Sequence, residues 1–210
     1  MLVTGRIRLS QSPYAAGTLL ISKKDPNAPR RVVHNYRALN DNTIKDHTPL
    51  PCQDDIIRAG TRGRVLAKMD LLMAYYQGLM EESDIHKTAF KTPLGLFEWV
   101  IMPQGLCNAV ATFQRFMNWV LCKYVGRFCH VYINDILVWS DSIAEHHRHM
   151  RLICQALREH GVVLSKSKSI LATDKVEFLG FNISYGSIED TPEKVDKIIG
   201  SRIPCNPPEV

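Results

Sequence analysis

Two aspartates stand where a strand would present a carboxylate at its end. Asp70 closes the apolar stretch 65–70, and Asp135 lies in the middle of a longer apolar stretch, 128–139. Convergent carboxylates bind divalent cations such as Mg²⁺, which prefers hard oxygen ligands. Two such cations, about 4 Å apart, promote phosphoryl transfer by activating the attacking hydroxyl and neutralising the leaving group. If the two strands share one sheet, these aspartates predict a metal-dependent phosphoryl-transfer site.

The segment around Asp135 also has a simpler interpretation. Residues 131–138 read Val-Tyr-Ile-Asn-Asp-Ile-Leu-Val, which is two strand-forming halves joined by the polar pair Asn134-Asp135. Both residue types favour tight turns, so the pattern predicts a β-hairpin. In that case Asp135 is a turn residue without a chemical role. Spacing alone does not decide between the two interpretations.

The elements around the two aspartates predict an α+β fold. Apolar residues recur at helical spacing from 111 to 124, which indicates an amphipathic helix with Asn108 upstream as its cap. A second helix should begin at Ser142, which forms a capping-box pattern with Glu145, and end at 160–161. We expect an antiparallel sheet that is covered by these two main helices.

Shorter elements fill the rest of the chain. Proline and glycine interrupt residues 11–51, which predicts short strands and turns with a tight loop at 25–27. Further predicted elements are a short helix at 56–64, a hairpin of 87–92 with 96–102 that places Phe97 and Trp99 on one face, a strand pair at 176–184, and a short helix from Pro192.

Composition and charge narrow the class of protein. Lys and Arg outnumber Asp and Glu by 26 to 21, and most of the excess lies in the N-terminal third, which suits a phosphate-bearing partner or simply a solvated basic surface. The six cysteines lack zinc-finger spacing. No apolar stretch is long enough to span a bilayer, and the start lacks a signal-peptide layout. We therefore expect an intracellular protein with no membrane partner.

Short sequence motifs follow one another along residues 11–199. They are Ser-Pro-Tyr-Ala at 12–15, Tyr-Arg-Ala-Leu-Asn at 36–40, Thr-Ile-Lys-Asp at 43–46, Pro-Leu-Pro at 49–51, Lys-Thr-Ala-Phe at 87–90, Met-Pro-Gln-Gly-Leu at 102–106, Asn-Ala at 108–109, Ala-Thr-Phe-Gln at 111–114, Tyr-Ile-Asn-Asp at 132–135 and Glu-Phe-Leu-Gly at 177–180. In type and order this series resembles the reverse transcriptases of gypsy-type LTR retrotransposons. Residues 132–135 are similar to the family's Tyr-x-Asp-Asp box, with Asn134 in place of the first Asp.

The resemblance implies the fingers and palm of a right-hand polymerase. It places the N-terminal part of the fingers at 1–64 and a palm with an antiparallel sheet at 65–186, with a fingers hairpin inserted near 86–103. Residues 187–210 would be the start of a thumb or a frayed tail, so that the thumb is largely absent.

The resemblance also implies roles for single residues. The catalytic positions would be Asp70, Asn134 and Asp135, and the ligands of a Mg²⁺ cofactor, or of Mn²⁺, would be Asp70, the Leu71 carbonyl and Asp135. The nucleotide would be bound by Lys23, Arg31 (or its neighbour Arg30), Tyr75 as a gate against a 2′-hydroxyl, and Gln104. The primer grip would be Phe178, Leu179 and Gly180. For Tyr75, packing beside Tyr76 is the simpler alternative.

The implied reaction is RNA-directed DNA synthesis, in which a primer 3′-hydroxyl attacks the α-phosphate of a dNTP. The implied partners are an RNA template, a DNA primer, a dNTP and, in an intact element, protease, RNase H and integrase. A cytoplasmic particle and the nucleus both stay open as the place of action.

Asn134 is the departure that bears most on activity. An amide oxygen is a weak ligand for Mg²⁺ and carries no charge, so the expected loss of rate is about a thousandfold or more. Asn35 is a second position where the family usually has Asp. We therefore expect an impaired polymerase. The alternative is a catalytically dead nucleic-acid-binding remnant or a host-recruited module.

Three histidines on the helix that begins at Ser142 are a further candidate. His146 and His149 are close enough on a helix to share a metal ion, with His147 between them. Exposed helical histidines are the simpler interpretation, and the resemblance implies no metal at this point.

Overall fold

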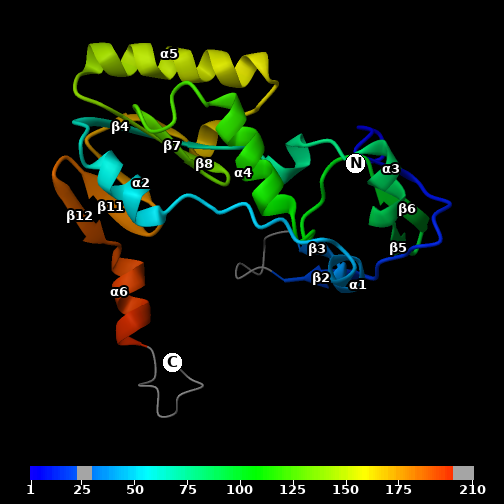
Figure 1. The fold of residues 1–210 in the computed structure, drawn as a ribbon. Helices are drawn as coiled ribbons and strands as arrows, with labels where there is room; N and C mark the ends of the chain where they lie inside the picture. The colour runs from blue at the N-terminus through cyan, green and yellow to red at the C-terminus, as the bar shows by residue number, and fades with distance from the viewer. Residues whose placement is uncertain (23–29, 201–210) are drawn as a thin grey trace. The chain divides into compact units, whose positions relative to one another are not determined.

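The computed structural model describes residues 1–22 and 30–200 and has a mixed α+β fold (Figure 1). Its strands are β1 (Ile7–Leu9), β2 (Thr18–Ile21), β3 (Arg31–His34), β4 (Val65–Asp70), β5 (Phe90–Thr92), β6 (Gly95–Trp99), β7 (Cys129–Tyr132), β8 (Asp135–Ser140), β9 (Ile170–Thr173), β10 (Lys175–Phe178), β11 (Phe181–Ser184) and β12 (Ser187–Asp190). Its α-helices are α1 (Arg37–Asp41), α2 (Gln53–Gly60), α3 (Glu82–Ile85), α4 (Ala109–Val120), α5 (Ile143–Glu159) and α6 (Pro192–Ile199). Short 3₁₀ turns are η1 (Ala74–Gln77), η2 (His86–Thr88) and η3 (Lys166–Lys168).

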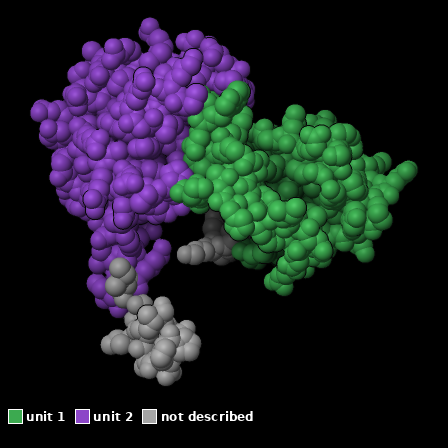
Figure 2. Space-filling view, viewed as in Figure 1, with its two compact units in different colours: residues 1–50, 71–120 green, residues 51–70, 121–210 purple. Residues whose placement is uncertain are grey.

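The chain forms two compact units (Figure 2). Unit 1 consists of Met1–Leu50 and Leu71–Val120, and unit 2 consists of Pro51–Asp70 and the chain from Leu121 onward. The chain therefore passes from one unit to the other immediately after Asp70. The tight loop expected at 25–27 lies outside the described residues, and so does the end of the chain from residue 201.

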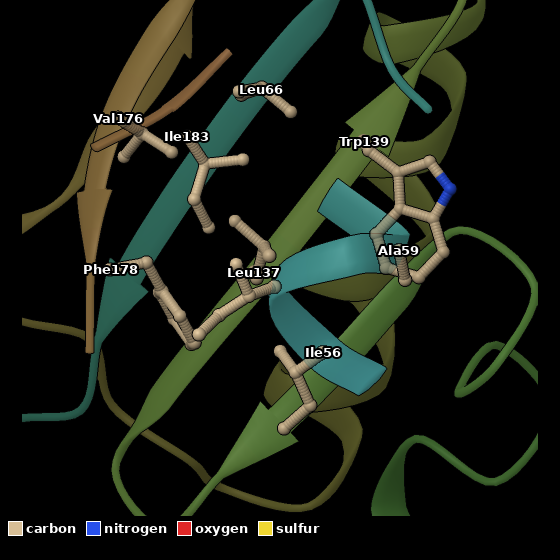
Figure 3. Close-up of a cluster of buried hydrophobic side chains, with 9 residues drawn as sticks. Ile56, Ala59, Leu66, Leu137, Trp139, Val176, Phe178 and Ile183 are labelled. Carbon is tan, nitrogen blue, oxygen red and sulfur yellow. The ribbon is translucent and has the colours of Figure 1, made fainter. Parts of the chain in front are cut away.

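Unit 2 contains an antiparallel four-stranded sheet in the order β7-β8-β4-β9 and a smaller sheet in the order β10-β11-β12. Strand alternation sends Leu66, Leu137 and Trp139 to one face of the larger sheet, where they pack with Ile56 of α2 and with Phe178 in one buried core (Figure 3). Helix α5 packs on the opposite face (Figure 1). Helix α2 packs on the other face, in the core around Leu66 and Leu137. The helix predicted after Asn108 is α4, which is assigned to unit 1, so its covering of this sheet stays a prediction.

The helices of unit 2 follow local signals in the sequence. Helix α2 begins at Gln53, earlier than the predicted residue 56, and its first turn carries acidic residues that suit the positive end of the helix dipole. The Ser142 cap predicted for α5 is confirmed, because its hydroxyl accepts a hydrogen bond from the backbone N–H of Glu145. The Glu145 carboxylate accepts from the N–H of Asp141 in place of that of Ser142. The predicted end at Gly161 is also confirmed, where φ is +68°.

Unit 1 contains a three-stranded sheet in the order β1-β6-β5 and the hairpin β2-β3. The prediction that Phe97 and Trp99 share a face is confirmed, since both are buried with Tyr36 and Phe90 in one aromatic core. Helix α1 and strand β1 were not predicted. The capping role predicted for Asn108 is wrong, because its side chain bonds the backbone of residues 44 and 46 instead of the first turn of α4.

Candidate active site

The two aspartates singled out in the sequence are direct partners in one sheet. Strands β4 and β8 pair antiparallel from Val65 opposite Ser140 to Asp70 opposite Asp135. Directly opposed residues of antiparallel strands have Cβ atoms about 4.5–5.5 Å apart and point to the same face. The condition set by the sequence, that the two strands share one sheet, is therefore met.

The turn beside Asp135 differs from the prediction by one position. Its two residues are Ile133 and Asn134, and Asp135 is already the first residue of β8, opposite Tyr132. Ile133 has φ of +56°, a left-handed conformation that is strained for a β-branched residue. The interpretation of Asp135 as a turn residue is thus wrong: the turn ends before it, and the strand fixes its direction.

Each carboxylate has a lysine nearby. Lys68 Nζ lies 3.9 Å from Asp135 Oδ1, and Lys168 Nζ lies 3.7 Å from Asp70 Oδ1. Asp135 Oδ1 is buried and has no hydrogen-bond partner within the part of the chain that the structure describes. Burial raises the pKa of Asp135 above its ordinary value; Lys68 opposes this shift, and the charge of Asp70 adds to it.

A segment far along the chain fixes the backbone of Asp70. Its N–H donates to the hydroxyl of Ser169 at 3.1 Å, and its carbonyl accepts from the N–H of Ser165 at 2.8 Å. The Ser169 hydroxyl in turn donates to the Ser165 carbonyl at 2.7 Å. The loop around η3 therefore holds the end of β4 on both sides of Asp70 and also carries Lys168.

This arrangement fits a divalent cation. An anionic oxygen that is buried without a hydrogen-bond donor is costly unless a cation completes its surroundings, and Asp135 Oδ1 is such an atom. Carboxylate oxygens are the ligands that Mg²⁺ prefers. Among residues 1–22 and 30–200, no group of three or more His, Cys, Asp or Glu side chains is placed to hold a metal. The protein side chains available here are thus the two carboxylates.

The predicted nucleotide-binding residues lie in unit 1. Tyr75 is half-buried in η1 and packs edge-to-face on Phe113 of α4, with ring centroids 5.8 Å apart. Gln104 is exposed, and Arg31 is exposed at the start of β3. Lys23 lies outside the described residues. The structure therefore groups Asp70 and Asp135 in unit 2, and the nucleotide-binding roles stay predictions.

Asn40 supports the loop that carries Gln104. Its side-chain amide donates to the Gly105 carbonyl at 2.8 Å, and its Oδ1 accepts from the Cys107 N–H at 2.9 Å. Gly105 has φ of +102°, which explains why glycine follows Gln104 here. The neighbouring Tyr76 stacks on Trp99 at 5.2 Å, and Tyr75 itself packs on Phe113, so the packing alternative considered for Tyr75 stays open.

The predicted primer-grip residues form the turn between β10 and β11. Leu179 and Gly180 both have positive φ, +51° and +78°, as a two-residue type I′ hairpin turn requires. Phe178 is completely buried in the core that Figure 3 shows. The side chain of Phe178 is therefore part of the core, whereas Leu179 and Gly180 are only partly buried, and the primer-grip role stays a prediction.

The prediction that the histidines of α5 are exposed is wrong for two of them. His146 and His149 are buried, and the Nδ1 atoms of both lie within 3.0 Å of the Ser140 hydroxyl. His146 Nε2 donates to the Leu171 carbonyl, and His149 stacks on Phe128 at 3.7 Å. Burial lowers the pKa of His149. These contacts join α5 to the sheet.

Four residues beside the carboxylate pair were not predicted from the sequence: Lys68, Lys168, Ser165 and Ser169. For Lys68 a signal existed, because a residue two positions before Asp70 in a strand must share its face. The other three lie about a hundred residues from Asp70, and nothing local in the sequence connects them to it.

Comparison with known proteins agrees with these observations. A model of the family "Reverse transcriptase (RNA-dependent DNA polymerase)" matches residues 21–183. The retrovirus-related Pol polyprotein from transposon 297 of Drosophila melanogaster is 37% identical over 100% of this chain and 20% of its own length. That from transposon gypsy of the same species is 33% identical over 94% of this chain and 20% of its own length. This chain thus spans about a fifth of the length of these relatives.

Solved structures agree as well. The foamy viral protease-reverse transcriptase in complex with double-stranded DNA superimposes with a TM-score of 0.88 and 26% identity, over 99% of this chain and 36% of the viral one. No helix in the described part of the chain is long and apolar enough to cross a membrane. With a family model over most of its length and relatives that are 33–37% identical, the chain belongs to the reverse transcriptase (RNA-dependent DNA polymerase) family and is homologous to the Pol polyproteins of gypsy-type LTR retrotransposons.

Proposed function

We propose that this chain is the fingers and palm of an RNA-directed DNA polymerase whose catalytic site is impaired by Asn134. The observation that carries the proposal is the direct pairing of Asp70 with Asp135, together with the buried Oδ1 of Asp135 that lacks a hydrogen-bond donor. The predicted division into fingers at 1–64, palm at 65–186 and the start of a thumb at 187–210 is part of this proposal.

The carboxylates of Asp70 and Asp135, with the Leu71 carbonyl, would hold Mg²⁺ or Mn²⁺. Such a cation, when bound, supplies the positive charge that activates a primer 3′-hydroxyl and neutralises a leaving pyrophosphate. The sheet contributes rigidity, since both carboxylates lie on paired strands and the backbone of Asp70 is bonded on both sides.

The roles proposed for the other residues are binding roles. Arg31 and Lys23 would bind the triphosphate of a dNTP, Tyr75 would lie against its sugar, and Gln104 would line its pocket. Leu179 and Gly180 would support a primer end. The similar foamy viral enzyme holds double-stranded DNA, and we propose a template–primer duplex with an RNA template as the ligand of this chain.

Asn134 is the reason to propose impaired catalysis. It lies in the two-residue turn beside Asp135, where the family has a carboxylate. The site then has two carboxylates instead of three, and the lysines near them offset their charge. Losing one charged ligand from a two-metal site reduces transition-state stabilisation, and we expect a rate about a thousandfold below that of a complete site.

Primer extension on an RNA template tests this proposal. The chain, its Asn134→Asp variant and the double variant Asn134→Asp with Asp70→Asn are compared with Mg²⁺ and then with Mn²⁺. We expect extension by Asn134→Asp alone. Equal extension by the parent chain would show that the amide is tolerated, and extension by the double variant would show that Asp70 is not catalytic.

A second candidate function is a nucleic-acid-binding module without catalysis, which the amide of Asn134 and the lysine-neutralised carboxylates favour. Fluorescence anisotropy with a labelled RNA/DNA duplex separates the two. Salt-dependent binding by both the parent and Asn134→Asp, with no extension by either, would favour this second candidate.

A further inference from the structure

Lys68 lies on the same face of the sheet as the carboxylate pair. It precedes Asp70 by two positions in β4, and its partner across the ladder is Leu137, so no acidic residue directly opposes it. Its ammonium reaches diagonally to Asp135, with Nζ 3.9 Å from Oδ1. The sheet itself therefore places a cation beside the buried carboxylate oxygen.

The surroundings of Lys68 limit where its ammonium can go. Its side chain is only 25% exposed, and Nζ lies 5.9 Å from the centroid of the buried Phe178 ring. An aromatic face attracts a cation, and a partly desolvated charge is screened less than a surface charge. The ammonium is thus held near Asp135 from one side by an aromatic ring and from the other by the carboxylate.

The contact is electrostatic and leaves the oxygen open to another ligand. At 3.9 Å the ammonium is too far from Oδ1 for a hydrogen bond, and no other described group donates to this atom. Oδ1 can therefore still accept a cation. A divalent cation that binds there meets a positive charge only a few ångströms away.

We propose that Lys68 is a built-in counter-cation of the carboxylate pair, which competes with a divalent cation at Asp135 and keeps the metal affinity of the site low. The inference rests on the proposed function, because it takes Asp70 and Asp135 as the metal ligands. In this chain Lys68 and Lys168 balance the two carboxylates, and Asn134 adds no further negative charge. Lys68 is therefore a determinant of metal affinity that acts through its charge.

Lys168 provides a matched comparison. It is as close to Asp70, at 3.7 Å, as Lys68 is to Asp135, but its side chain is 69% exposed. Solvent screens such a charge, and its side chain can turn away when a metal binds. Removing the charge of Lys168 should therefore matter much less than removing that of Lys68.

The test measures binding of Mn²⁺ alone to the whole chain, by the electron paramagnetic resonance signal of free Mn²⁺. We expect Lys68→Met to bind Mn²⁺ about tenfold more tightly than the parent chain, because the dication no longer meets a fixed positive charge. Methionine keeps the unbranched stem that packs near Phe178. Lys168→Met should change the dissociation constant by less than about threefold, and Lys68→Arg, which keeps the charge, should bind as weakly as the parent.

Two further variants separate failure of this inference from failure of the proposed function. If Asp135→Asn removes Mn²⁺ binding but Lys68→Met leaves it unchanged, the metal site stands and the role of Lys68 is refuted. If Asp70→Asn and Asp135→Asn both leave Mn²⁺ binding intact, the carboxylate pair is not the metal site, and both proposals fall. Should Lys68→Met unfold, as circular dichroism would reveal, Lys68→Gln carries the same expectation.

Discussion

Gln53 donates a hydrogen bond from Nε2 to the hydroxyl of Tyr132 over 2.6 Å. The bond joins the first residue of α2 to the last residue of β7, next to the turn that contains Asn134. Tyr132 lies opposite Asp135 in the ladder. The helix that covers one face of the sheet is thereby attached to the edge of the candidate site.

This contact predicts a measurable coupling between the two residues. We expect Gln53→Ala and Tyr132→Phe each to lower the free energy of unfolding, and the double variant to lower it by about 1 kcal/mol less than the sum of the single effects. Urea unfolding of the four proteins gives the coupling directly. Strictly additive effects would show that the bond contributes nothing to stability.

Ser169→Ala should weaken the support of Asp70. The variant leaves the Asp70 N–H without the Ser169 acceptor and removes the shorter of two hydrogen bonds to the Ser165 carbonyl, which also accepts from the Lys168 N–H. We therefore expect a loss of about 1–3 kcal/mol of unfolding free energy. The matched control is Ser167→Ala, at an exposed position in the same loop. If chemical denaturation finds equal stability for the two variants, the two bonds of Ser169 do not hold the loop.

Gly63 is predicted to tolerate no side chain. A Cβ at this position would lie 2.6 Å from Trp139 Cβ and 2.8 Å from the backbone nitrogen of Ser140. Gly63→Ala would push the connection before β4 away from β8, at a cost of about 1–3 kcal/mol. Gly17→Ala is the control, since its Cβ would meet nothing within 4 Å. Thermal unfolding should separate the two variants, and a harmless Gly63→Ala would contradict the packing described.

Because His34 is buried in its neutral form, we expect the protein to lose stability at acid pH. Burial lowers the pKa of this side chain from 6.5 to about 4, beside Phe90 and within 3.1 Å of the Thr18 hydroxyl. As the pH falls below 6.5, the unfolded chain takes up the proton first, so the contribution of neutral His34 is complete above that pH and is lost toward pH 4. Between pH 7.5 and 4.5 we expect the proton uptake of His34 in the unfolded chain to lower the free energy of unfolding by about 2–3 kcal/mol.

The measurement for His34 compares urea unfolding at these two pH values in the parent chain and in His34→Phe. The variant cannot take up a proton at this position, so its stability should fall less over the same range, while other groups titrate equally in both proteins. Equal pH dependence in the two proteins would show that His34 is not the buried neutral base described.

Much of the fold could be predicted because its signals are local. The cap at Ser142, the strand that ends in Asp70 and the paired aromatics Phe97 and Trp99 each depend on a few neighbouring residues. The two carboxylates were also found, since Asp70 closes one apolar stretch and Asp135 interrupts another. Their pairing needed the register of β4 against β8, which no short stretch of sequence contains.

The rest depends on contacts between distant residues. Ser165 and Ser169 bond the backbone of Asp70, and a serine in a loop carries no mark of its distant partner. The buried state of His146 and His149 follows from the hydroxyl of Ser140 on another element. The turn of Ile133 and Asn134 was misplaced by one residue because it requires a positive φ at an isoleucine, which sequence preferences disfavour.

The position of β4 in its sheet has a consequence for synthesis of the chain. This strand lies between β8 and β9, and both of its neighbours are made later. At about 5–20 residues per second, the roughly 70 residues from Asp70 to the end of β8 take on the order of 4–14 s to be made, and the end of β9 follows after roughly 30 more residues. During the first of these intervals the apolar segment Val65–Asp70 has neither partner, so the strand that carries the first carboxylate needs protection, for example by a chaperone, until β8 has been made.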